Sequence, residues 1–327
     1  MPARRPVPGR SQPLSKPTVT SARPFLKWAG GKGQLLESLS GYFPKALADG
    51  SVQNYFEPFL GGGAMFFHVM QNYPVKSALL MDANEELVVA YSVVQKDVAA
   101  LMVLLGQMER DYLKLSEARR RERYLKVRDI LNRQRAGMDF RKYSEAWIER
   151  TAQLLFLNKT CYNGLFRVNR SGGFNVPFGK YARPTILDAA NLAKTSAVLA
   201  KAEIRLGDFG DLQRLESKVK SGSFIYYDPP YRPLSRTASF TAYSKGAFGD
   251  EEQKRLAGMF RDLDRRGVYQ MLSNSDPKNT DPKDDFFEDA YRKYQDTFYR
   301  VPASRSINSN ASRRGRINEI VITNYKA

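Results

Sequence analysis

Over residues 224–231 the chain reads Phe224-Ile225-Tyr226-Tyr227-Asp228-Pro229-Pro230-Tyr231, an apolar run that leads directly into Asp-Pro-Pro-Tyr. The apolar run predicts a buried strand over 223–227. Pro229 and Pro230 fix φ and remove two backbone donors, and each biases the preceding residue toward an extended conformation. The turn is therefore stiff, and it holds carboxylate and carbonyl oxygens at the strand's carboxyl end. Open α/β sheets bind their ligands at such ends.

The chemistry of this turn suits an amine. An exocyclic amino group such as N6 of adenine has two hydrogens to donate, and the Asp228 carboxylate and a backbone carbonyl can accept both. Tyr231 can stack on the base, a contact worth about 1–3 kcal/mol. The same four residues also fit a turn that merely ends a strand, so the rest of the sequence has to decide between the two interpretations.

Short apolar runs elsewhere in the chain predict further strands. Helical patterns separate the first five strands, which indicates a doubly wound, mostly parallel sheet. A polar, basic connection over 302–316 joins the last two strands, as in a long antiparallel hairpin. The expected fold is α/β, a Rossmann-like sheet ending in that hairpin. The other predicted strands are at 52–56, 78–81, 203–206, 268–273, 297–301 and 318–323.

Residues 88–186 interrupt this alternation of strands and helices. Their periodicity predicts helices at 88–108, 110–135 and 144–158, followed by a loop over 159–183 rich in Gly, Asn, Arg and aromatic residues.

We therefore expect three parts. Residues 1–22 carry Arg and Lys without an acid among Pro, Ser and Thr, which is typical of a disordered basic arm. Residues 23–87 and 187–327 would form the sheet domain, and 88–186 a mostly helical insertion.

A glycine-rich turn follows the strand predicted at 52–56. It reads Glu57-Pro58-Phe59-Leu60-Gly61-Gly62-Gly63 and precedes an apolar helix. The glycines allow backbone to approach a ligand closely, although the spacing does not match the dinucleotide fingerprint. Asp82 ends the next strand about 20 residues later, the separation at which an acid meets ribose hydroxyls in nucleoside-binding folds. Alone, Asp82 could equally be a helix N-cap, but together with the glycine turn it predicts a nucleoside pocket.

Composition narrows the function classes. The 327 residues include 52 Lys and Arg against 34 Asp and Glu, a net charge of +18 that favours a polyanionic partner. Cys161 is the single cysteine and His68 the single histidine, so an intrachain disulfide is excluded and a Cys/His zinc site is disfavoured. His68 lies in the apolar run 64–70, typical of a core helix rather than of a catalytic triad.

No run reaches the roughly 20 apolar residues of a membrane span, and no signal peptide is recognisable. We therefore expect an intracellular protein.

The segment Lys27-Trp28-Ala29-Gly30-Gly31-Lys32 does not satisfy the phosphate-loop pattern. Followed in order by the glycine turn, by Asp82 and by Asp-Pro-Pro-Tyr, it resembles the Dam family of DNA adenine-N6 methyltransferases. The resemblance runs from about residue 23 to 326. It includes Cys161–Asn169 and Gly173–Tyr181, which look like the family's target-recognition loop, and 238–243 and 318–324. Gly173 replaces an acidic residue common in members that read GATC, and 110–135 is longer and more basic than expected.

The resemblance implies a role for each matching residue. The methyl donor, S-adenosylmethionine, would contact Trp28, Lys32, Asp82 and Asp228 and lie against Phe59, Gly61 and Gly63, with Asp208 and Phe209 flanking its adenine. In the recognition loop, Tyr162 would wedge into the base stack, Arg167 would read a guanine and Pro177 would touch a neighbouring base. Lys27 and Tyr181 would meet the outer base and Lys180 a phosphate. Asn163, Leu165 and Asn175 complete the expected DNA-binding set.

The expected reaction is a direct in-line methyl transfer to adenine N6 in duplex DNA, with the base flipped out of the helix and the site GATC or related to it. Neither a metal nor a covalent enzyme–base bond is expected, and Cys161 lacks the preceding proline typical of cytosine-C5 enzymes. We expect a monomer that acts in the cytoplasm at the nucleoid. RNA adenine, cytosine N4, and a non-catalytic DNA-binding role on the same scaffold remain open, as does the choice between restriction–modification and a regulatory or phage role.

Overall fold

The computed structural model describes residues 21–169, 171–215, 217–232, 248–304 and 316–327. Residues 1–20 of the predicted arm, the motif 238–243 and most of the basic connection lie outside these residues. Ala22 is buried, and both of its backbone groups bond the Gln71 side chain. The folded chain therefore begins before residue 23.

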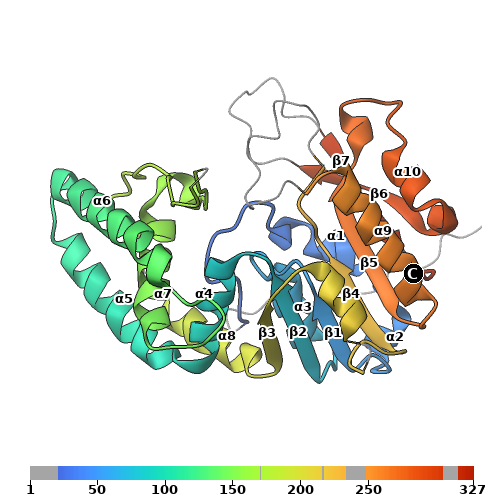
Figure 1. Cartoon of the computed structure of the whole chain (residues 1–327), viewed down its shortest axis with the longest axis horizontal. Coiled ribbons are helices and arrows are strands. Elements are labelled where there is room, and N and C mark those ends of the chain that lie inside the picture. The colour runs from blue at the N-terminus through green and yellow to red at the C-terminus, as the bar shows by residue number, and fades with distance from the viewer. Residues whose placement is uncertain (1–20, 170, 216, 233–247, 305–315) are drawn as a thin grey trace, which may run out of the picture.

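The seven predicted strands all form, and they make one sheet (Figure 1). The order is β3-β2-β1-β4-β5-β7-β6, with β1 to β5 parallel and β7 antiparallel to both of its neighbours. This confirms the expected fold class. The strands are β1 (Asn54–Glu57), β2 (Ser77–Asp82), β3 (Ala202–Leu206), β4 (Ser223–Tyr227), β5 (Tyr269–Ser275), β6 (Phe298–Ser304) and β7 (Arg316–Thr323).

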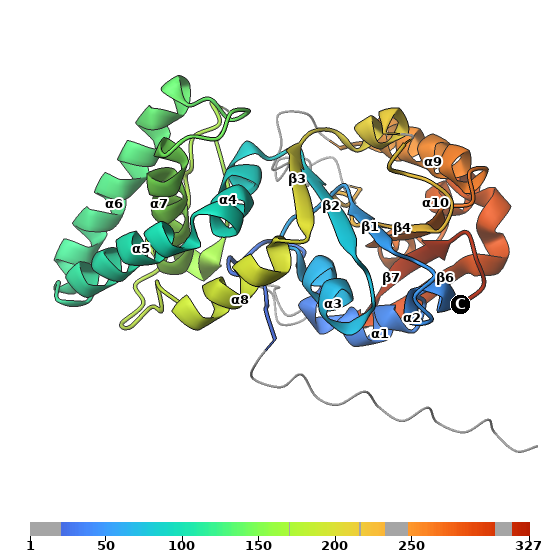
Figure 2. The ribbon, with the colours of Figure 1, turned by 90° about the horizontal axis from the view of Figure 1, so that it is seen from below.

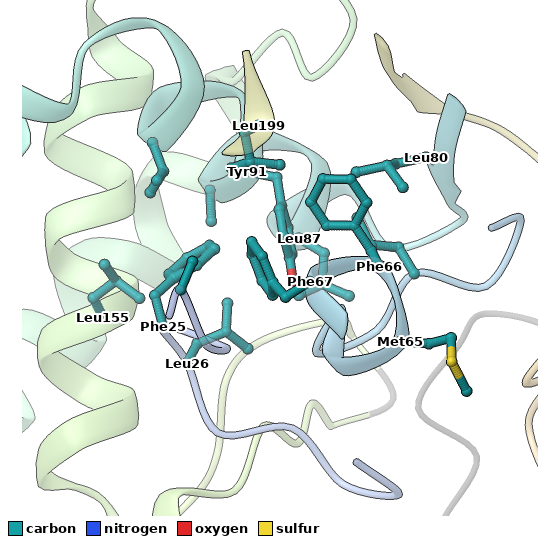
Figure 3. Close-up of a cluster of buried hydrophobic side chains, with 14 of the residues drawn as sticks. Phe25, Leu26, Met65, Phe66, Phe67, Leu80, Leu87, Tyr91, Leu155 and Leu199 are labelled. Atoms are coloured by element: carbon teal, nitrogen blue, oxygen red, sulfur yellow. The ribbon is translucent and has the colours of Figure 1, made fainter. Parts of the chain in front are cut away.

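A separate apolar core covers each face of the sheet. Side chains alternate between the two faces along a strand, so Phe224 and Tyr226 of β4 enter one core, whereas Ile225 and Tyr227 enter the other. The first core contains α3 (Ala64–Asn72) and continues to the inserted helices, as the contacts of Phe66, Phe67 and Tyr91 show (Figure 3). The second core contains α9 (Asp250–Asp264), with α10 (Phe286–Ala290) beside it (Figure 2). The short helices α1 (Leu36–Ser40) and α2 (Lys45–Ala48) complete the first side.

The long insertion contributes a group of helices beside the β3 edge of the sheet (Figures 1 and 2). The prediction of one helix over 88–108 is wrong, because Asp97 takes φ −133° and ψ 38° and the chain bends by 109° there. The predicted helix at 110–135 likewise begins later, after Ser116, whose side chain accepts from the Arg119 N–H. The helices are α4 (Glu85–Lys96), α5 (Val98–Leu113), α6 (Glu117–Gln134) and α7 (Ala146–Thr160), and α8 (Ala189–Leu199) packs beside them just after the insertion ends.

The connection between β3 and β4 also differs from the prediction. It contains the short 3₁₀ helix η4 (Phe209–Arg214) where an α-helix was expected. Asp208 and Asp211 form a capping box at its start, which fixes the chain immediately after β3.

Within the part of the chain that the structure describes, no single helix has the length and apolar character to cross a membrane. The bent pair α4 and α5 meets those criteria together, by length and composition alone.

Candidate active site

The carboxyl ends of the parallel strands open onto one cavity of about 710 Å³. Each of β1, β2, β3 and β4 contributes the residues that directly follow it, as expected for ligand sites in open α/β sheets. The cavity brings together every residue that the sequence predicted for catalysis and for methyl-donor binding. These are Trp28, Lys32, Phe59, Gly61, Gly63, Asp82, Asp208, Phe209, Asp228, Pro229, Pro230 and Tyr231.

The Asp228 carboxylate lies at the end of β4, between a cation and a hydroxyl. Lys32 Nζ is 2.7 Å from Asp228 Oδ1, and Ser273 Oγ on β5 donates to the same oxygen at 3.4 Å. Burial raises the pKa of Asp228 above its ordinary value, and the Lys32 ammonium opposes that rise. The lysine therefore favours the ionised, hydrogen-accepting form of this carboxylate.

Lys32 also contacts the tyrosine of the same motif. Its Nζ donates to the Tyr231 hydroxyl at 2.5 Å and lies 4.6 Å from the ring centroid. The Glu319 carboxylate on β7 is 3.9 Å from Nζ. The lysine side chain is 4% exposed, so it is a buried cation held by two acids and a phenol. The sequence associated Lys32 with the methyl donor alone, whereas the structure joins it to both ends of Asp-Pro-Pro-Tyr.

The glycine turn between β1 and α3 packs tightly against Trp28. Gly61 and Gly63 have φ of 48° and 69°, which other residues rarely adopt. A Cβ on Gly61 would lie 3.2 Å from Trp28 Cδ1, and one on Gly63 would lie 2.5 Å from the Tyr91 hydroxyl. The turn therefore needs glycine because of its backbone conformation and because a side chain would not fit. Its backbone lines the cavity.

Asp82 holds this turn against the end of β2. Its Oδ2 accepts from the Gly61 N–H at 2.9 Å and its Oδ1 from the Asn84 N–H at 2.8 Å. Burial raises the pKa of Asp82 to about 6. The N-cap of α4 is Asn84, which accepts from the N–H groups of Glu86 and Leu87, so the alternative interpretation of Asp82 as that cap is wrong.

Asp208 and Phe209 share one cation that the sequence did not reveal. Arg255 on α9 donates to both carboxylate oxygens of Asp208, at 2.7 and 2.8 Å, and its guanidinium lies 3.9 Å from the Phe209 ring centroid. Phe209 also packs against Phe59 and Phe248, with ring centroids 5.4 and 5.7 Å away. These aromatic faces form the part of the cavity best suited to a purine ring. No sequence signal distinguished Arg255 from the other cations of α9.

Glu57 is a second carboxyl in the cavity, and no role was predicted for it from the sequence. It is 3% exposed at the end of β1, accepts from the Tyr55 hydroxyl at 2.7 Å and lines the cavity. Burial, reinforced by the nearby acids Asp228 and Asp82, holds its pKa well above the usual range. A buried acid at the end of an apolar strand, directly before proline, was the signal that could have found it.

The predicted recognition loop folds back on itself between α7 and α8. Antiparallel bridges pair Cys161 with Phe178 and Val168 with Phe174. Arg167 is exposed at this hairpin, and its Nε and Nη2 donate to the side-chain and backbone oxygens of Asn175, at 2.8 and 3.1 Å. The structure therefore brings two of the predicted DNA-binding residues into direct contact.

The other predicted DNA-binding residues gather at the base of this hairpin. Tyr162 is 55% exposed, and its N–H donates to the Pro177 carbonyl. The Tyr181 hydroxyl accepts from the Asn163 N–H at 3.0 Å, and Lys27 Nζ lies 6.0 Å from the Tyr181 ring centroid. The remaining members, Leu165 and Lys180, are half-buried and exposed respectively.

The loop also reaches the cavity, because Phe166 lines it and stacks on Trp28 with ring centroids 4.9 Å apart. Among the described residues, no group of three or more His, Cys, Asp or Glu side chains could hold a metal ion.

The sheet order and the acidic strand ends around this cavity match the Rossmann-like methyltransferase fold. Comparison with known proteins is more specific. The model of the family described as D12 class N6 adenine-specific DNA methyltransferase matches residues 28–307. The chain therefore belongs to the D12 class of N6 adenine-specific DNA methyltransferases, which confirms the expected activity, DNA adenine methylation.

Three relatives illustrate the range of the family. The Type II methyltransferase M.MjaIII of Methanocaldococcus jannaschii is 43% identical over 304 residues, 93% of this chain and 99% of the relative. The Type II methyltransferase M1.LlaDCHI of Lactococcus lactis subsp. cremoris is 35% identical, over 93% and 95% of the two chains. The DNA adenine methylase of Escherichia coli K12 is 31% identical, over 91% and 94%.

Proposed function

We propose that this enzyme transfers a methyl group from S-adenosylmethionine to N6 of an adenine that has been flipped out of duplex DNA, within a GATC or related site. The observation that carries the proposal is the convergence of Asp228, Tyr231 and the glycine turn on one cavity that the recognition loop also reaches. The insertion 88–186 would be the DNA-reading domain, and the remaining folded chain the catalytic domain of a monomer.

The cavity residues fit the methyl donor, a nucleoside joined to a zwitterionic amino acid. S-adenosylmethionine supplies an electrophilic methyl group when bound. Asp82 would accept hydrogens from the ribose hydroxyls, while Phe59 and Phe209 would enclose the purine and Asp208 would meet its polar edge. Glu57 is a buried carboxyl suited to the donor's α-ammonium group, whose arrival would lower the pKa of that carboxyl.

The motif after β4 would hold the target adenine. Asp228 and the Pro229 carbonyl accept the two N6 hydrogens, which turns the nitrogen lone pair away from the ring and toward the methyl group. Tyr231 stacks on the base. Lys32 keeps Asp228 ionised, so that it accepts rather than donates. The transfer is direct and in line, and most of the acceleration comes from positioning and fixed dipoles.

The recognition loop would read the DNA from the major groove. Arg167 donates to Asn175 through Nε and Nη2, so the Nη1–Nη2 edge faces away from Asn175. That edge can donate to O6 and N7 of guanine, the commonest specific contact in DNA recognition. Tyr162, exposed at the base of the hairpin, would fill the gap that the flipped base leaves. The net charge of +18 supports binding to the phosphate backbone.

Methylation of an unmodified plasmid in vitro tests this proposal. The plasmid is incubated with enzyme and S-adenosylmethionine, and modified positions are mapped by single-molecule sequencing. We expect N6-methyladenine within GATC. Methylation confined to sites that lack GATC would overturn the site, and the absence of any modified DNA base would favour RNA as the substrate or a non-catalytic role.

A further inference from the structure

The proposed function gives the basic helix α6 no role of its own within the DNA-reading domain, yet one of its faces binds the recognition loop. Arg120 and Tyr124 are one turn apart and Asn132 lies two turns further on, and all three bond to residues of the loop or to Ala182 just after it. Arg120 Nη1 donates to the Ala182 carbonyl at 2.6 Å, and the Tyr124 hydroxyl donates to the Val176 carbonyl at 2.6 Å. Figure 1 shows the loop lying alongside the helix.

Asn132 binds a single residue of the loop through both of its amide groups. Its Nδ2 donates to the Phe174 carbonyl at 3.0 Å, and its Oδ1 accepts from the Phe174 N–H at 2.7 Å. This is the pattern that a neighbouring strand would offer to one residue. The two bonds therefore fix Phe174, and no adjacent residue, against α6.

This clamp fixes which side chains of the loop face outward. Phe174 and Val176 are 3% and 0% exposed, whereas Asn175 is half-buried and Pro177 is exposed. The segment thus alternates as a strand does, and a slip by one residue would exchange its inward and outward side chains. Asn175, next to the clamped residue, is the residue that holds the Arg167 guanidinium.

We infer that α6 determines target specificity from outside the recognition loop, with Asn132 as the positioning residue that orients Arg167 through Phe174 and Asn175. This rests on the proposed reading of DNA by Arg167. Asn132 acts through another residue, so its loss affects the base pair that Arg167 contacts and no other.

The test measures kcat and KM for the wild type and for Asn132→Ala on oligonucleotide duplexes substituted one base pair at a time. The Arg167→Ala profile identifies the base pair concerned. We expect Asn132→Ala to raise KM for the cognate duplex and to reduce discrimination at that base pair, each by about tenfold, which is about 1.4 kcal/mol. Discrimination at other positions and kcat at saturating DNA should be retained.

The double variant Asn132→Ala/Arg167→Ala separates positioning from a general structural effect. If Asn132 acts through Arg167, the double variant discriminates no worse than Arg167→Ala alone, because coupled residues are not additive. Additive losses, or an equal loss at every base pair, would overturn the inference. A wild type that discriminates at no position would overturn the proposed site-specific function and this inference with it.

Two control variants remove the same chemical groups elsewhere. Asn279 clamps Asn318 with the same pair of bonds, at 2.7 and 2.9 Å, far along the chain from the loop. Asn279→Ala should therefore leave the discrimination profile unchanged.

Tyr124→Phe removes one bond to the loop and should weaken discrimination at the same base pair. Tyr112→Phe removes a buried hydroxyl that has no hydrogen-bond partner among the described residues and should not.

Discussion

Lys32 Nζ lies 2.7 Å from Asp228 Oδ1, which joins the segment before α1 to the motif after β4. The carboxylate is buried, and burial alone would favour its neutral form. A neutral Asp228 would carry a hydroxyl that donates, so one of its two oxygens would no longer serve as an anionic acceptor. In the proposed mechanism the ammonium group of Lys32 is therefore part of what makes Asp228 an acceptor.

This ion pair should set the acidic limit of methyl transfer. Replacing Lys32 by Met removes the cation that opposes the raised pKa of Asp228. The acidic limb of the kcat–pH profile should move upward by about 1–3 pH units, because activity requires the ionised carboxylate and is lost as the pH falls through its pKa. The measurement is kcat at saturating DNA and methyl donor from pH 5.5 to 9. Lys96→Met is the control, because Lys96 Nζ also lies over a tyrosine ring, 4.5 Å from the centroid of Tyr143, but does not line the cavity. An unmoved limb in Lys32→Met would contradict this role.

Affinity for the methyl donor should depend on the ionisation of Asp82. Its pKa is raised to about 6 by burial, so below that pH the unbound protein carries a protonated carboxyl at this site. Ribose hydroxyls would donate to the carboxylate form, so binding would displace a proton at low pH. Calorimetric titration from pH 5 to 7 should show affinity falling by up to about tenfold per pH unit below 6. Asp82→Asn should bind more weakly and without this dependence, and a flat wild-type profile would exclude Asp82 from the contact.

Arg255 should contribute to binding of the methyl donor and not to the methyl-transfer step. It holds both oxygens of Asp208 and covers one face of Phe209. Arg255→Ala should raise KM for the methyl donor by about tenfold, or about 1.4 kcal/mol, with little change in kcat. Arg255→Lys should recover little, because lysine cannot donate in the two-pronged geometry. Arg265→Ala, which removes an exposed pair with Asp262 near the end of the same helix, is the control. A change in kcat alone would argue against this support.

Gly63 should be required for stability as well as for the cavity. Its φ is 69°, and a Cβ added there would lie 2.5 Å from the buried Tyr91 hydroxyl, so alanine would be strained and crowded. Gly63→Ala should lower the free energy of unfolding by about 1–3 kcal/mol, measured by urea denaturation. Gly137→Ala, at a glycine with no atom within 4 Å of the added carbon, should stay within about 0.5 kcal/mol of the wild type. Equal effects at the two glycines would contradict this requirement.

The sequence predicted the sheet well because buried parallel strands are short apolar runs that end in recognisable turns. All seven strands form, and the residues named for the donor and for catalysis share one cavity. Helix boundaries were less predictable. The break at Asp97 lies within a continuous amphipathic pattern, because α4 and α5 both pack on α7 and α8, and the apolar periodicity is maintained through the bend.

The pairs that organise the site could not be predicted, because they join residues far apart in the chain. Lys32 was assigned to the donor, but its contacts with Asp228 and Tyr231 depend on how the segment before α1 crosses the strand ends. In the sequence, Arg255 and Asn132 look like ordinary polar residues of surface helices. Only the folded structure shows that Arg255 binds Asp208 and that Asn132 binds Phe174.

The role of Asp228 in methyl transfer to adenine N6 is tested most directly by nucleoside analysis. Wild type and Asp228→Ala are incubated with duplex DNA and S-adenosylmethionine carrying a tritiated methyl group, and the DNA is digested to nucleosides. The wild type should place the label in N6-methyldeoxyadenosine, and Asp228→Ala should lose on the order of a thousandfold in rate while still binding DNA. Label that survives in Asp228→Ala at the wild-type rate, or that appears in N4-methyldeoxycytidine, would contradict the proposed chemistry.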